Sequence, residues 1–405
     1  MGTDRVVIVG SSVGGVRAAQ ALRNKGFEGE VILIGAEDVE PYDKPPLSKR
    51  FLAGDQDASD LSLMPDADWS GLDITKRLGQ PAEALDLSNR HVELRGGERI
   101  GYDALILATG VRPKMIGETG DPLIHTIREL RESVSLRERL TAGSQIVVVG
   151  GGFIGSEVAS TAAALGVKVT IVEALSTPFS RVLGATVGSL VAQLHADNGV
   201  EVITGAAVVR VKTLGDDTGV VHLGDGSEIP ASAVVVGIGC LPNTEWLGSS
   251  GLRIEDGVFT DEYCRAPGTD NVFAIGDVAR WFDRRSNTHR RVEHWTNAVQ
   301  QAQLVAHNIV NPDDRQANTK APYFWSDQNG VKIQMVGRNE LSDEVEVLRC
   351  DTALGKRSIA LYSREQQLAA VVAFGWPQVI PKMRRAWEQG ASLEEVRRLI
   401  ETAAT

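Results

Sequence analysis

One stretch of the sequence, residues 145–173, constrains the fold of this chain more than any other. Its apolar run at residues 146–149 predicts a short, buried parallel strand, and Gly150, Gly152 and Gly155 follow it as an intact G-x-G-x-x-G. The first glycine permits a tight turn, the second lets the backbone approach a pyrophosphate, and the third lets the helix pack closely on the strand. We therefore expect a helix whose N-terminus attracts a dinucleotide phosphate.

Glu173 ends the second strand of this unit. A carboxylate at that position accepts hydrogen bonds from a ribose diol and repels a 2′-phosphate, so it favours NAD over NADP. Because the strand, the glycines, the helix and the terminal acid all agree, the dinucleotide site is favoured over the alternative of a simple packing turn.

The N-terminus repeats this pattern. We expect a strand over residues 5–9, a helix to about residue 23 and a second strand over residues 31–34, around the segment GSSVGG. Two dinucleotide units in one chain indicate one tightly held cofactor and one that comes and goes.

The N-terminal motif is altered at two points. Gly10 and Gly15 keep its outer positions, but Ser12 takes the middle one, where it is small and can hydrogen-bond a phosphate. The acid is displaced by one residue, because Ala36 stands where it is expected and Glu37 follows. We assign Glu37 to a ribose.

Composition narrows the class of protein. A chain of 405 residues predicts about three domains, and a net charge of −11 argues against a nucleic-acid binder. No apolar run approaches the ~20 residues of a membrane span, and no signal-peptide pattern precedes the first strand, so we expect a cytoplasmic protein. Cys240, Cys264 and Cys350 are far apart in sequence, which predicts packing residues and no disulfide framework.

The order of buried runs predicts a discontinuous first domain. Residues 102–110 and 271–279 read as its strands, and residues 234–243 end the inserted unit. The expected domains are 1–113 with 241–316, then 114–240, then 317–405. Asp277 ends one of these strands beside a glycine turn, as an acceptor for a ribityl hydroxyl or for water near phosphates; the alternative is a helix N-cap.

The C-terminal part has a different character. Residues 331–336, 344–348, 358–362 and 368–374 predict strands of an antiparallel sheet, and two helices follow. Ser392 and Glu395 form a capping box before the second helix. The expected fold is therefore α/β, with two Rossmann-like domains and a smaller C-terminal α+β domain.

Seven motifs give the chain a specific resemblance over nearly its whole length. It resembles the FAD-dependent, NADH-linked ferredoxin reductases coupled to oxygenases, of the putidaredoxin reductase and biphenyl dioxygenase reductase type, which share the architecture of glutathione reductase and are related to rubredoxin reductase and apoptosis-inducing factor. The motifs are PYDKPPLSK (41–49), ATGVRP (108–113), GGGFIGSEVA (150–159), RVLG (181–184), FAIGDVA (273–279), VEHWTNA (292–298) and PYFWSDQ (322–328).

The resemblance implies that the first unit holds FAD, the inserted unit binds NADH and the third domain covers the flavin. It places Lys49 and Glu157 as the catalytic pair, ion-paired beside the flavin ring, where a cation favours the electron-rich reduced flavin. The alternatives are a solvated surface charge for Lys49 and a helix-dipole acid for Glu157.

The resemblance also implies a set of cofactor-binding residues. For FAD they are Gly10, Ser12, Gly14, Gly15, Glu37, Lys44, Pro45, Lys49, Ala108, Thr109, Gly110, Arg112, Gly276, Asp277, Glu293, His294, Trp295 and Trp325. For NADH they are Gly150, Gly152, Phe153, Ile154, Gly155, Glu173 and Arg181. For Arg112 and Arg181 a surface salt bridge is the alternative to a phosphate or ribose contact, and each tryptophan taken alone reads as core.

The chain departs from the family pattern at Ser12, at the displaced Glu37, and at Asn329-Gly330, where relatives often carry an aromatic residue. The third departure lies close to the expected flavin.

The cysteines bear on how electrons leave. Relatives that reduce disulfides or peroxides use redox cysteines early in the chain, and here no cysteine precedes residue 240. Flavin accepts two electrons and releases them singly, so the expected acceptor is a [2Fe-2S] ferredoxin that serves a cytochrome P450 or a ring-hydroxylating oxygenase. The alternatives are an NADH oxidase, a rubredoxin- or nitrite-linked reductase, and a non-enzymatic protein similar to apoptosis-inducing factor.

An acidic ferredoxin needs a basic docking surface. Two clusters are candidates, although such runs are often only solvated faces: Arg284, Arg285, Arg290 and Arg291, and Lys382, Arg384 and Arg385. No metal-ligand spacing is found, so no bound metal is expected. The sequence leaves open whether the protein is a monomer or a dimer.

Overall fold

The computed structural model describes residues 3–117, 120–215, 218–352 and 355–404. These residues form two compact units. Unit 1 contains the residues up to Asp43, Leu61–Arg112 and Leu241–Pro322, and unit 2 contains Lys44–Asp60, Pro113–Cys240 and the residues from Tyr323 onward. Each unit is described by itself. The three-domain division stays a prediction.

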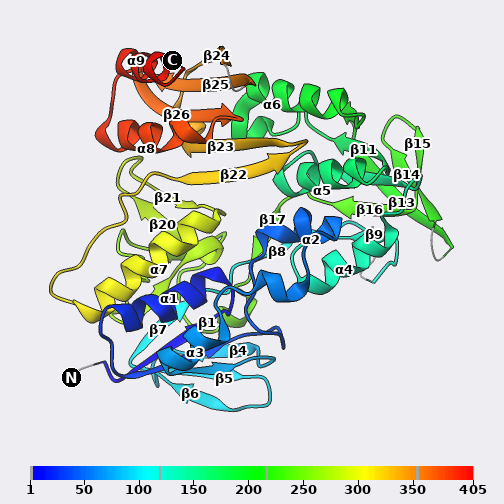
Figure 1. The fold of residues 1–405 in the computed structure, drawn as a ribbon. Coiled ribbons are helices and arrows are strands. Elements are labelled where there is room, and N and C mark those ends of the chain that lie inside the picture. The colour runs from blue at the N-terminus through cyan, green and yellow to red at the C-terminus, as the bar shows by residue number, and fades with distance from the viewer. Residues whose placement is uncertain (1–2, 118–119, 216–217, 353–354, 405) are drawn as a thin grey trace. The chain divides into compact units, whose positions relative to one another are not determined.

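Unit 1 is built on a five-stranded parallel sheet (Figure 1). Its order is β19-β7-β1-β2-β3, with bounds Val272–Ala274, Ala104–Leu107, Arg5–Val9, Glu30–Ile34 and Ile74–Arg77. The strands are rich in Val, Ile and Leu because helices and other strands cover both faces of the sheet.

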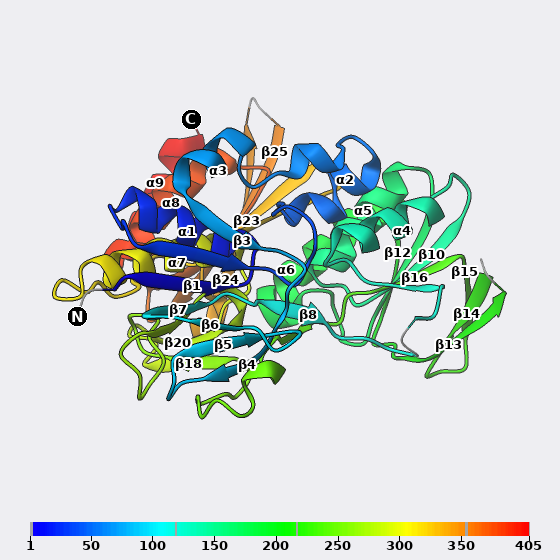
Figure 2. The same cartoon turned by 90° about the horizontal axis from the view of Figure 1, so that it is seen from below.

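Alternate side chains of these strands pack on opposite faces. Val6 and Ile8 of β1 face a core shared with α1 (Val13–Asn24), α3 (Asp66–Leu72) and α7 (Trp295–Val310). Val7 and Val9, which alternate with them along β1, face a small antiparallel sheet. Figure 2 shows this sheet beside the parallel one. Its strands are β4 (Ala82–Asp86), β5 (His91–Leu94) and β6 (Arg99–Gly101).

A second small sheet of unit 1 contains β18 (Val258–Thr260), β20 (Ala279–Asp283) and β21 (Thr288–Arg291). Two further strands, β8 (Val111–Pro113) and β17 (Cys240–Pro242), pair with each other where the chain leaves and re-enters this unit.

The first half of unit 2 repeats the architecture of a parallel sheet. Its order is β12-β11-β10-β16-β9, with bounds Glu201–Thr204, Lys168–Glu173, Gln145–Val149, Ala233–Val236 and Ile124–His125. One face packs against β13 (Val208–Gly215), β14 (Thr218–Leu223) and β15 (Glu228–Ala231). The helices of this half are α4 (Leu130–Arg139), α5 (Phe153–Ala164) and α6 (Ser180–Asp197).

A short segment, Lys44–Asp60, also belongs to unit 2. It contains a 3-10 helix at Pro45–Ser48 and α2 at Arg50–Ala53. Leu47, Phe51 and Leu52 are buried. Its backbone is fixed by two hydroxyls, since Ser133 of α4 donates to the Leu47 carbonyl and Thr161 of α5 donates to the Ser48 carbonyl. The segment is therefore tied to both α4 and α5.

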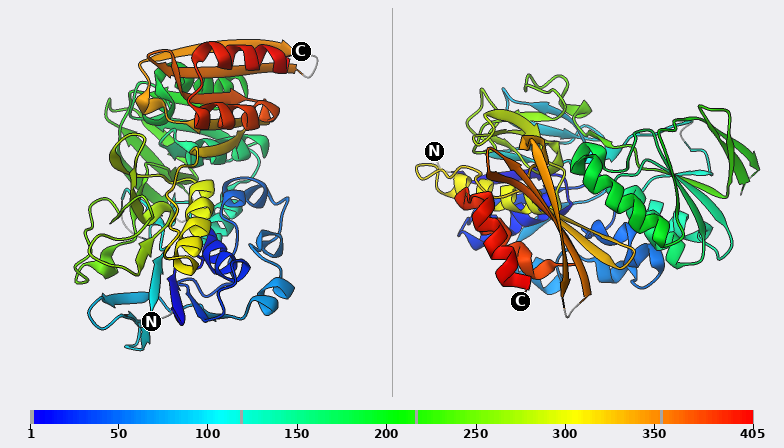
Figure 3. Two further views of the ribbon diagram at one scale, coloured as in Figure 1. Left: turned by 90° about the vertical axis from the view of Figure 1, so that its left-hand side faces the viewer. Right: turned by 90° about the horizontal axis from the view of Figure 1, so that it is seen from above.

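The C-terminal half of unit 2 is a five-stranded antiparallel sheet with helices on both faces. Its order is β22-β23-β26-β25-β24, with bounds Tyr323–Gln328, Val331–Gly337, Gln367–Phe374, Gly355–Arg364 and Glu344–Thr352. Apolar residues of α6 pack on one face. Figure 3 shows α8 (Ile380–Gln389) and α9 (Leu393–Ala404) against the other.

The predicted strand–helix–strand units, the antiparallel sheet and the two last helices are confirmed, and Ser392 and Glu395 form the expected capping box. The run at 271–279 is shorter than predicted, because Gly276–Val278 turns into a 3-10 helix. Among the described residues no helix is long and apolar enough to cross a membrane.

Candidate functional site

The first glycine loop, between β1 and α1, leaves no room for side chains at its two outer glycines. A Cβ on Gly10 would lie 2.2 Å from the Ala108 carbonyl oxygen, and one on Gly15 would lie 1.8 Å from the Gly10 carbonyl oxygen. Gly10 also has a φ of +118°, which L side chains rarely adopt. The backbone is thus drawn tightly around the start of α1, as a pyrophosphate site requires.

Ser12 is the N-cap of α1, and its side chain makes no capping hydrogen bond. Gly14 lies in the first turn, where a Cβ would be 3.8 Å from the Cβ of Ala108 and 3.7 Å from the side chain of Ile275. The predicted contact of Ser12 with a phosphate stays a prediction.

Glu37, the displaced acid, is held by Tyr42, whose hydroxyl donates to its carboxylate at 2.5 Å. The neighbouring Gly35 leaves room for Ser11, since a Cβ there would come within 2.3 Å of the Ser11 hydroxyl oxygen. The structure thus fixes this carboxylate beyond the end of β2, and its contact with a ribose stays a prediction.

The segment Ala108–Thr109–Gly110 follows β7 and is held by one asparagine. The Asn243 amide donates to the Thr109 carbonyl, the Thr109 hydroxyl donates to the Asn243 carbonyl, and the Asn243 backbone N–H donates to the Gly110 carbonyl, all within 3.0 Å. Arg112 instead pairs with Glu245 at 2.5 Å. For Arg112 the salt bridge is therefore the observed contact.

Gly276 and Asp277 stand after β19. The Gly276 N–H donates to Oε1 of Gln301, a fully buried residue of α7. Nε2 of Gln301 has no hydrogen-bond partner among the described residues. Such an unmet buried donor beside a glycine turn fits a ligand acceptor. Asp277 lies inside the 3-10 helix whose N-cap is Ile275, so it is not an N-cap.

The start of α7 gathers three predicted residues. Trp295 is the first helical residue and donates its indole N–H to Asp43 at 2.8 Å, which fixes its ring. His294 is the N-cap, and the exposed Glu293 pairs with Arg291.

The second glycine loop matches the first in geometry. A Cβ on Gly150 would lie 2.5 Å from the Gly237 carbonyl oxygen, and one on Gly155 would lie 2.4 Å from the Gly150 carbonyl oxygen. Gly152 is the N-cap of α5. Glu173 accepts the Gly151 N–H, so the predicted ribose acid is part of the loop.

Three other residues predicted to bind NADH surround the start of α5 and α6. The Phe153 ring lies between those of Phe179 and Phe324, with centroids 4.8 and 4.4 Å away. Ile154 is unusually exposed for its type, at 42%. Arg181 is exposed in the first turn of α6. These side chains present apolar and cationic surface next to the loop.

Lys49 and Glu157 form the predicted ion pair, with 2.7 Å between Nζ and Oε2 and side-chain exposures of 17% and 3%. Lys49 also donates to the Pro45 carbonyl. The Glu157 carboxylate also accepts hydrogen bonds from two hydroxyls, those of Ser48 at 2.6 Å and Ser326 at 2.5 Å. The readings of Lys49 as a solvated charge and Glu157 as a dipole acid are not what the structure shows.

Lys44 and Trp325 complete the predicted set in unit 2. Lys44 is the N-cap of the 3-10 helix and donates to the Arg128 carbonyl at 3.1 Å. Trp325 lies on β22 and is half-buried, with Tyr323 stacked beside it at 6.1 Å between centroids. Trp325 is thus not a core tryptophan.

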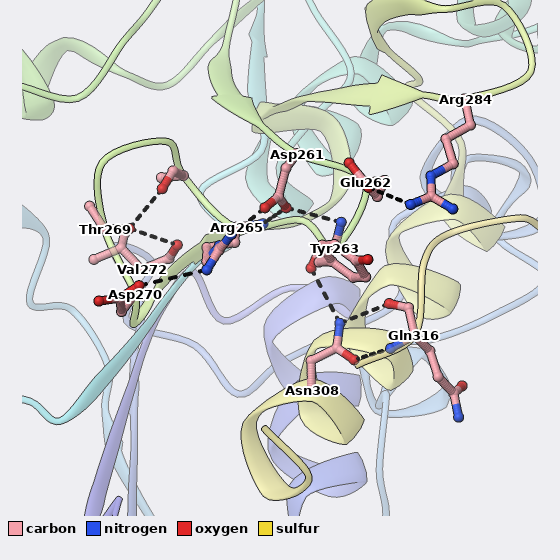
Figure 4. Close-up of polar contacts among 11 residues, drawn as sticks. Asp261, Glu262, Tyr263, Arg265, Thr269, Asp270, Val272, Arg284, Asn308 and Gln316 are labelled. Atoms are coloured by element: carbon pink, nitrogen blue, oxygen red, sulfur yellow. Dashed lines mark hydrogen bonds and ion pairs between the residues drawn. The ribbon is translucent and has the colours of Figure 1, made fainter. Parts of the chain in front are cut away.

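The first basic cluster carries little free charge. Arg284 is exposed but pairs with Glu262 at 2.6 Å, as Figure 4 shows. Arg290 and Arg291 are mostly covered and face Asp283 and Asp256. Their pairing reduces the positive field that this cluster offers to a partner.

The second cluster lies on α8. Lys382 and Arg385 are exposed and line a groove between α8 and α9, and the Arg384 guanidinium stands 5.4 Å from the centre of the Tyr323 ring. Since Tyr323 stacks beside Trp325, this cluster is connected by contacts to a predicted flavin residue.

Cys264 is fully buried, and burial raises the pKa of its thiol, so it is a packing residue. Cys240 is partly buried, and the side chain of Cys350 lies outside the described residues. Within the described ranges no group of three or more His, Cys, Asp and Glu residues is arranged to hold a metal.

The sequence reasoning did not name four residues that hold these sites: Ser48, Asn243, Gln301 and Ser326. Ser48 and Ser326 stand inside the motifs PPLS and FWSDQ. Both serines donate to Glu157, which is 109 and 169 residues away in the sequence, so the residues around each serine do not identify this partner.

Comparison with known proteins identifies the family. The model of the family "Pyridine nucleotide-disulphide oxidoreductase" matches residues 4–302, and "Reductase C-terminal" matches residues 323–403. The rhodocoxin reductase of Rhodococcus erythropolis is 37% identical over 82% of this chain and 78% of its own length. The biphenyl dioxygenase system ferredoxin–NAD(+) reductase component of Paraburkholderia xenovorans is 35% identical over 88% of this chain and 86% of its own.

Solved structures agree with this result. The putidaredoxin reductase in a covalent complex with putidaredoxin is 29% identical and superposes with a TM-score of 0.90 over 100% of this chain and 99% of that one. The ferredoxin reductase for the CYP199A2 system of Rhodopseudomonas palustris is 30% identical, with a TM-score of 0.91 over 99% and 100%. The predicted fold class is confirmed. The chain therefore belongs to the pyridine nucleotide-disulphide oxidoreductase family and, within it, to the ferredoxin–NAD(+) reductases that its motifs resemble.

Proposed function

We propose that this protein is an FAD-containing oxidoreductase that takes hydride from NADH and delivers electrons one at a time to a [2Fe-2S] ferredoxin. FAD, when bound, supplies the step from a two-electron donor to a one-electron acceptor. The relatives are ferredoxin–NAD(+) reductase components by name, which supports this acceptor class, with a cytochrome P450 or a ring-hydroxylating oxygenase downstream.

One observation carries the proposal: the buried pair of Lys49 and Glu157, one turn into the helix that starts at the second glycine loop. Glu157 is shielded from solvent and has Lys49 as its counter-ion, so the ion pair holds the positive charge of Lys49 in one place. A fixed cation of this kind favours negative charge that builds up on a neighbouring ring.

Unit 1 supplies a set of residues that fits FAD. The tight loop at Gly10 and Gly15 suits a pyrophosphate, and Glu37, held by Tyr42, suits a ribose. Nε2 of Gln301 is a buried donor without a partner among the described residues, beside the Gly276 turn.

The second loop supplies the NADH site. Gly150 and Gly155 shape it, and Glu173 selects an unphosphorylated ribose because a second negative charge would lie against it. Arg181, exposed at the start of α6, is proposed to contact the nucleotide.

We place ferredoxin docking at α8. Lys382 and Arg385 are exposed there, whereas the cluster at Arg284 is paired with acids. A local basic face on a chain of net charge −11 attracts an acidic partner and orients it. We further propose that the protein works in the cytoplasm, where NADH is available.

The test is direct. The purified protein should be yellow and should bleach with NADH under anaerobic conditions, and subsequent mixing with candidate [2Fe-2S] proteins should restore the colour rapidly. Slow transfer to every ferredoxin together with rapid oxygen consumption would instead identify an NADH oxidase. A colourless protein that cannot be reconstituted with FAD would contradict the cofactor assignment.

A further inference from the structure

A chain of hydrogen bonds extends from Glu157 into the interior of unit 2. Beyond Ser326, which contacts Oε1 of Glu157 at 2.5 Å, Nε2 of Gln328 lies 2.9 Å from the Ser326 hydroxyl. Oε1 of Gln328 lies 3.1 Å from Nε2 of His195, and Nδ1 of His195 lies 3.2 Å from the side-chain nitrogen of Asn329. Five side chains from β22, α5, α6 and the β22–β23 turn are thus connected in one row.

The chemistry of the groups fixes the direction of every bond. An ionised carboxylate only accepts, so the Ser326 hydroxyl donates its single proton to Glu157 and accepts from Gln328. Gln328 then presents its oxygen to His195, which must carry its proton on Nε2. Nδ1 is left as the acceptor of the Asn329 amide. All four bonds therefore donate toward Glu157.

Because the row is buried, each of its hydrogen-bonding groups needs a partner within the protein. Ser326 and His195 are fully buried and Gln328 is 1% exposed, so an unmet donor or acceptor here has no water to replace its partner. Burial lowers the pKa of His195. A proton on Nδ1 would also oppose the Asn329 amide donor.

The far end of the row is fixed by a turn. Asn329 and Gly330 have φ values of 50° and 73°, and Gln328 pairs with Val331, as in a two-residue hairpin loop. The Asn329 backbone N–H donates to the hydroxyl of Ser160 on α5 at 2.6 Å. The turn that departs from the family pattern thus orients the last side chain of the row.

We infer that His195 and Gln328 are positioning residues for the reaction, because they hold the Ser326 hydroxyl on Glu157 and so fix Glu157 against Lys49. This inference rests on the proposed function of that pair. His195 and Gln328 act through Ser326 and Glu157.

The charged surroundings support a role centred on Glu157. Lys49, from the segment that precedes α2, is the cation that faces it, and Ser48 and Ser326 face it as hydroxyl donors. Asp327, which neighbours Ser326 in β22, pairs with Lys332 at 2.6 Å instead. Besides Glu157, His195 is the titratable group in the row.

The first experiment reads the row without catalysis. In protein labelled with ¹⁵N-histidine, His195 is assigned by its loss in His195→Gln. We expect a protonated Nε2, an unprotonated Nδ1, and no titration in the range near pH 6.5 where free histidines titrate. In Gln328→Leu the Nε2 signal should shift toward a weaker hydrogen bond. The opposite tautomer, or titration near pH 6.5, overturns the inference.

The second experiment measures the pH profile of flavin reduction by NADH. Ser326→Ala removes a hydroxyl that donates to the carboxylate and so disfavours its ionised form, which should move the acid limb upward by about one pH unit. Gln328→Leu leaves the Ser326 hydroxyl without its own donor and should move the limb in the same direction. Ser326→Thr, which keeps the hydroxyl, should restore it. Thr170→Val is the matched control, because Thr170 is a buried hydroxyl that donates to a carboxylate, that of Glu201, outside the row.

An unmoved acid limb in both row variants overturns the positioning role, even if their stability falls. If Glu157→Gln itself leaves the rate and its pH profile unchanged, the proposed role of Glu157 fails, and the positioning role fails with it. The state of His195 in the NMR experiment still shows whether the row exists.

Discussion

The Glu173 carboxylate accepts the backbone N–H of Gly151 at 2.8 Å, and its other oxygen accepts the N–H of Leu175 at 2.8 Å. Two backbone donors thus hold the acid at the end of β11 in a single orientation beside the glycine loop. A carboxylate fixed in this way does not have to be ordered when a nucleotide binds, which supports the proposed discrimination between a ribose and a ribose phosphate.

Replacing Glu173 with Ala should therefore raise the KM for NADH by about tenfold or more and narrow the preference for NADH over NADPH. The reason is the loss of a charge-assisted acceptor for the diol and of the repulsion against a 2′-phosphate. Steady-state kcat/KM for both nucleotides measures the change. A preference ratio equal to that of the unaltered protein would refute the ribose role.

Gly10→Ala should release FAD. The new Cβ would approach the Ala108 carbonyl oxygen to 2.2 Å at a φ of +118°, and relief of such strain requires a backbone shift at the phosphate loop. The flavin-to-protein absorbance ratio should fall. Gly26→Ala is the control, since Gly26 also has a positive φ of +82° but has no atom within 4 Å of the added Cβ. Equal flavin content in both variants would contradict the assignment.

Local patterns made much of the fold predictable. The glycines of both loops, the buried parallel strands and the Ser392–Glu395 box are each determined within about thirty residues, where spacing and side-chain type are decisive. The small sheets that cover the parallel ones were not predicted. Strand β13, for example, is mostly exposed and irregular in register, so it lacks a clear alternation of apolar side chains.

The hydrogen-bond partners of Glu157 could not be predicted from the residues near it in the sequence. Ser48 and Ser326 contact it across separations of 109 and 169 residues, and Asn243 reaches Thr109 across 134. The ion pair itself came from the family resemblance. Only the folded chain brings Ser48 and Ser326 to Glu157 and connects Glu157 to His195.

The free energy of unfolding should decrease at acidic pH because two histidines are buried in the folded protein. Burial lowers the pKa of both His125 and His195 in the folded protein, whereas in the unfolded chain they titrate near 6.5. Below about pH 6.5 the unfolded chain binds protons that the folded chain does not, so the free energy of unfolding decreases as pH falls toward the folded pKa.

The slope should reach about 1.4 kcal/mol per pH unit for each group. Urea unfolding at a series of pH values measures it, and the double variant His125→Gln/His195→Gln should show a shallower slope. The same slope in both proteins would mean that neither histidine is held neutral in the folded chain.

Charge reversal on α8 should weaken ferredoxin reduction without affecting the reaction with NADH. In Lys382→Glu/Arg385→Glu the KM for ferredoxin should rise about tenfold at low salt, with a smaller effect at high salt because the interaction is screened. NADH-driven flavin reduction serves as the internal control. Arg284→Glu, at the cluster already paired with Glu262, should have the lesser effect. The reverse order would place docking on unit 1.

Replacing Lys49 with Ala should slow flavin reduction by NADH on the order of tenfold or more, or loosen FAD. The variant leaves Glu157, which is 3% exposed, without its counter-ion, and Ser48 and Ser326 are then its donors in the part of the chain that the structure describes. Removal of one partner of a buried pair destabilises by roughly 3 kcal/mol.

Lys332→Ala is the matched control, because it breaks an ion pair of 2.6 Å whose side chains are about 40% exposed, and exposed pairs contribute below about 1 kcal/mol. Stopped-flow rates, flavin content and urea unfolding distinguish the effects. If Lys49→Ala resembles the control in all three, the fixed charge has no part in the reaction.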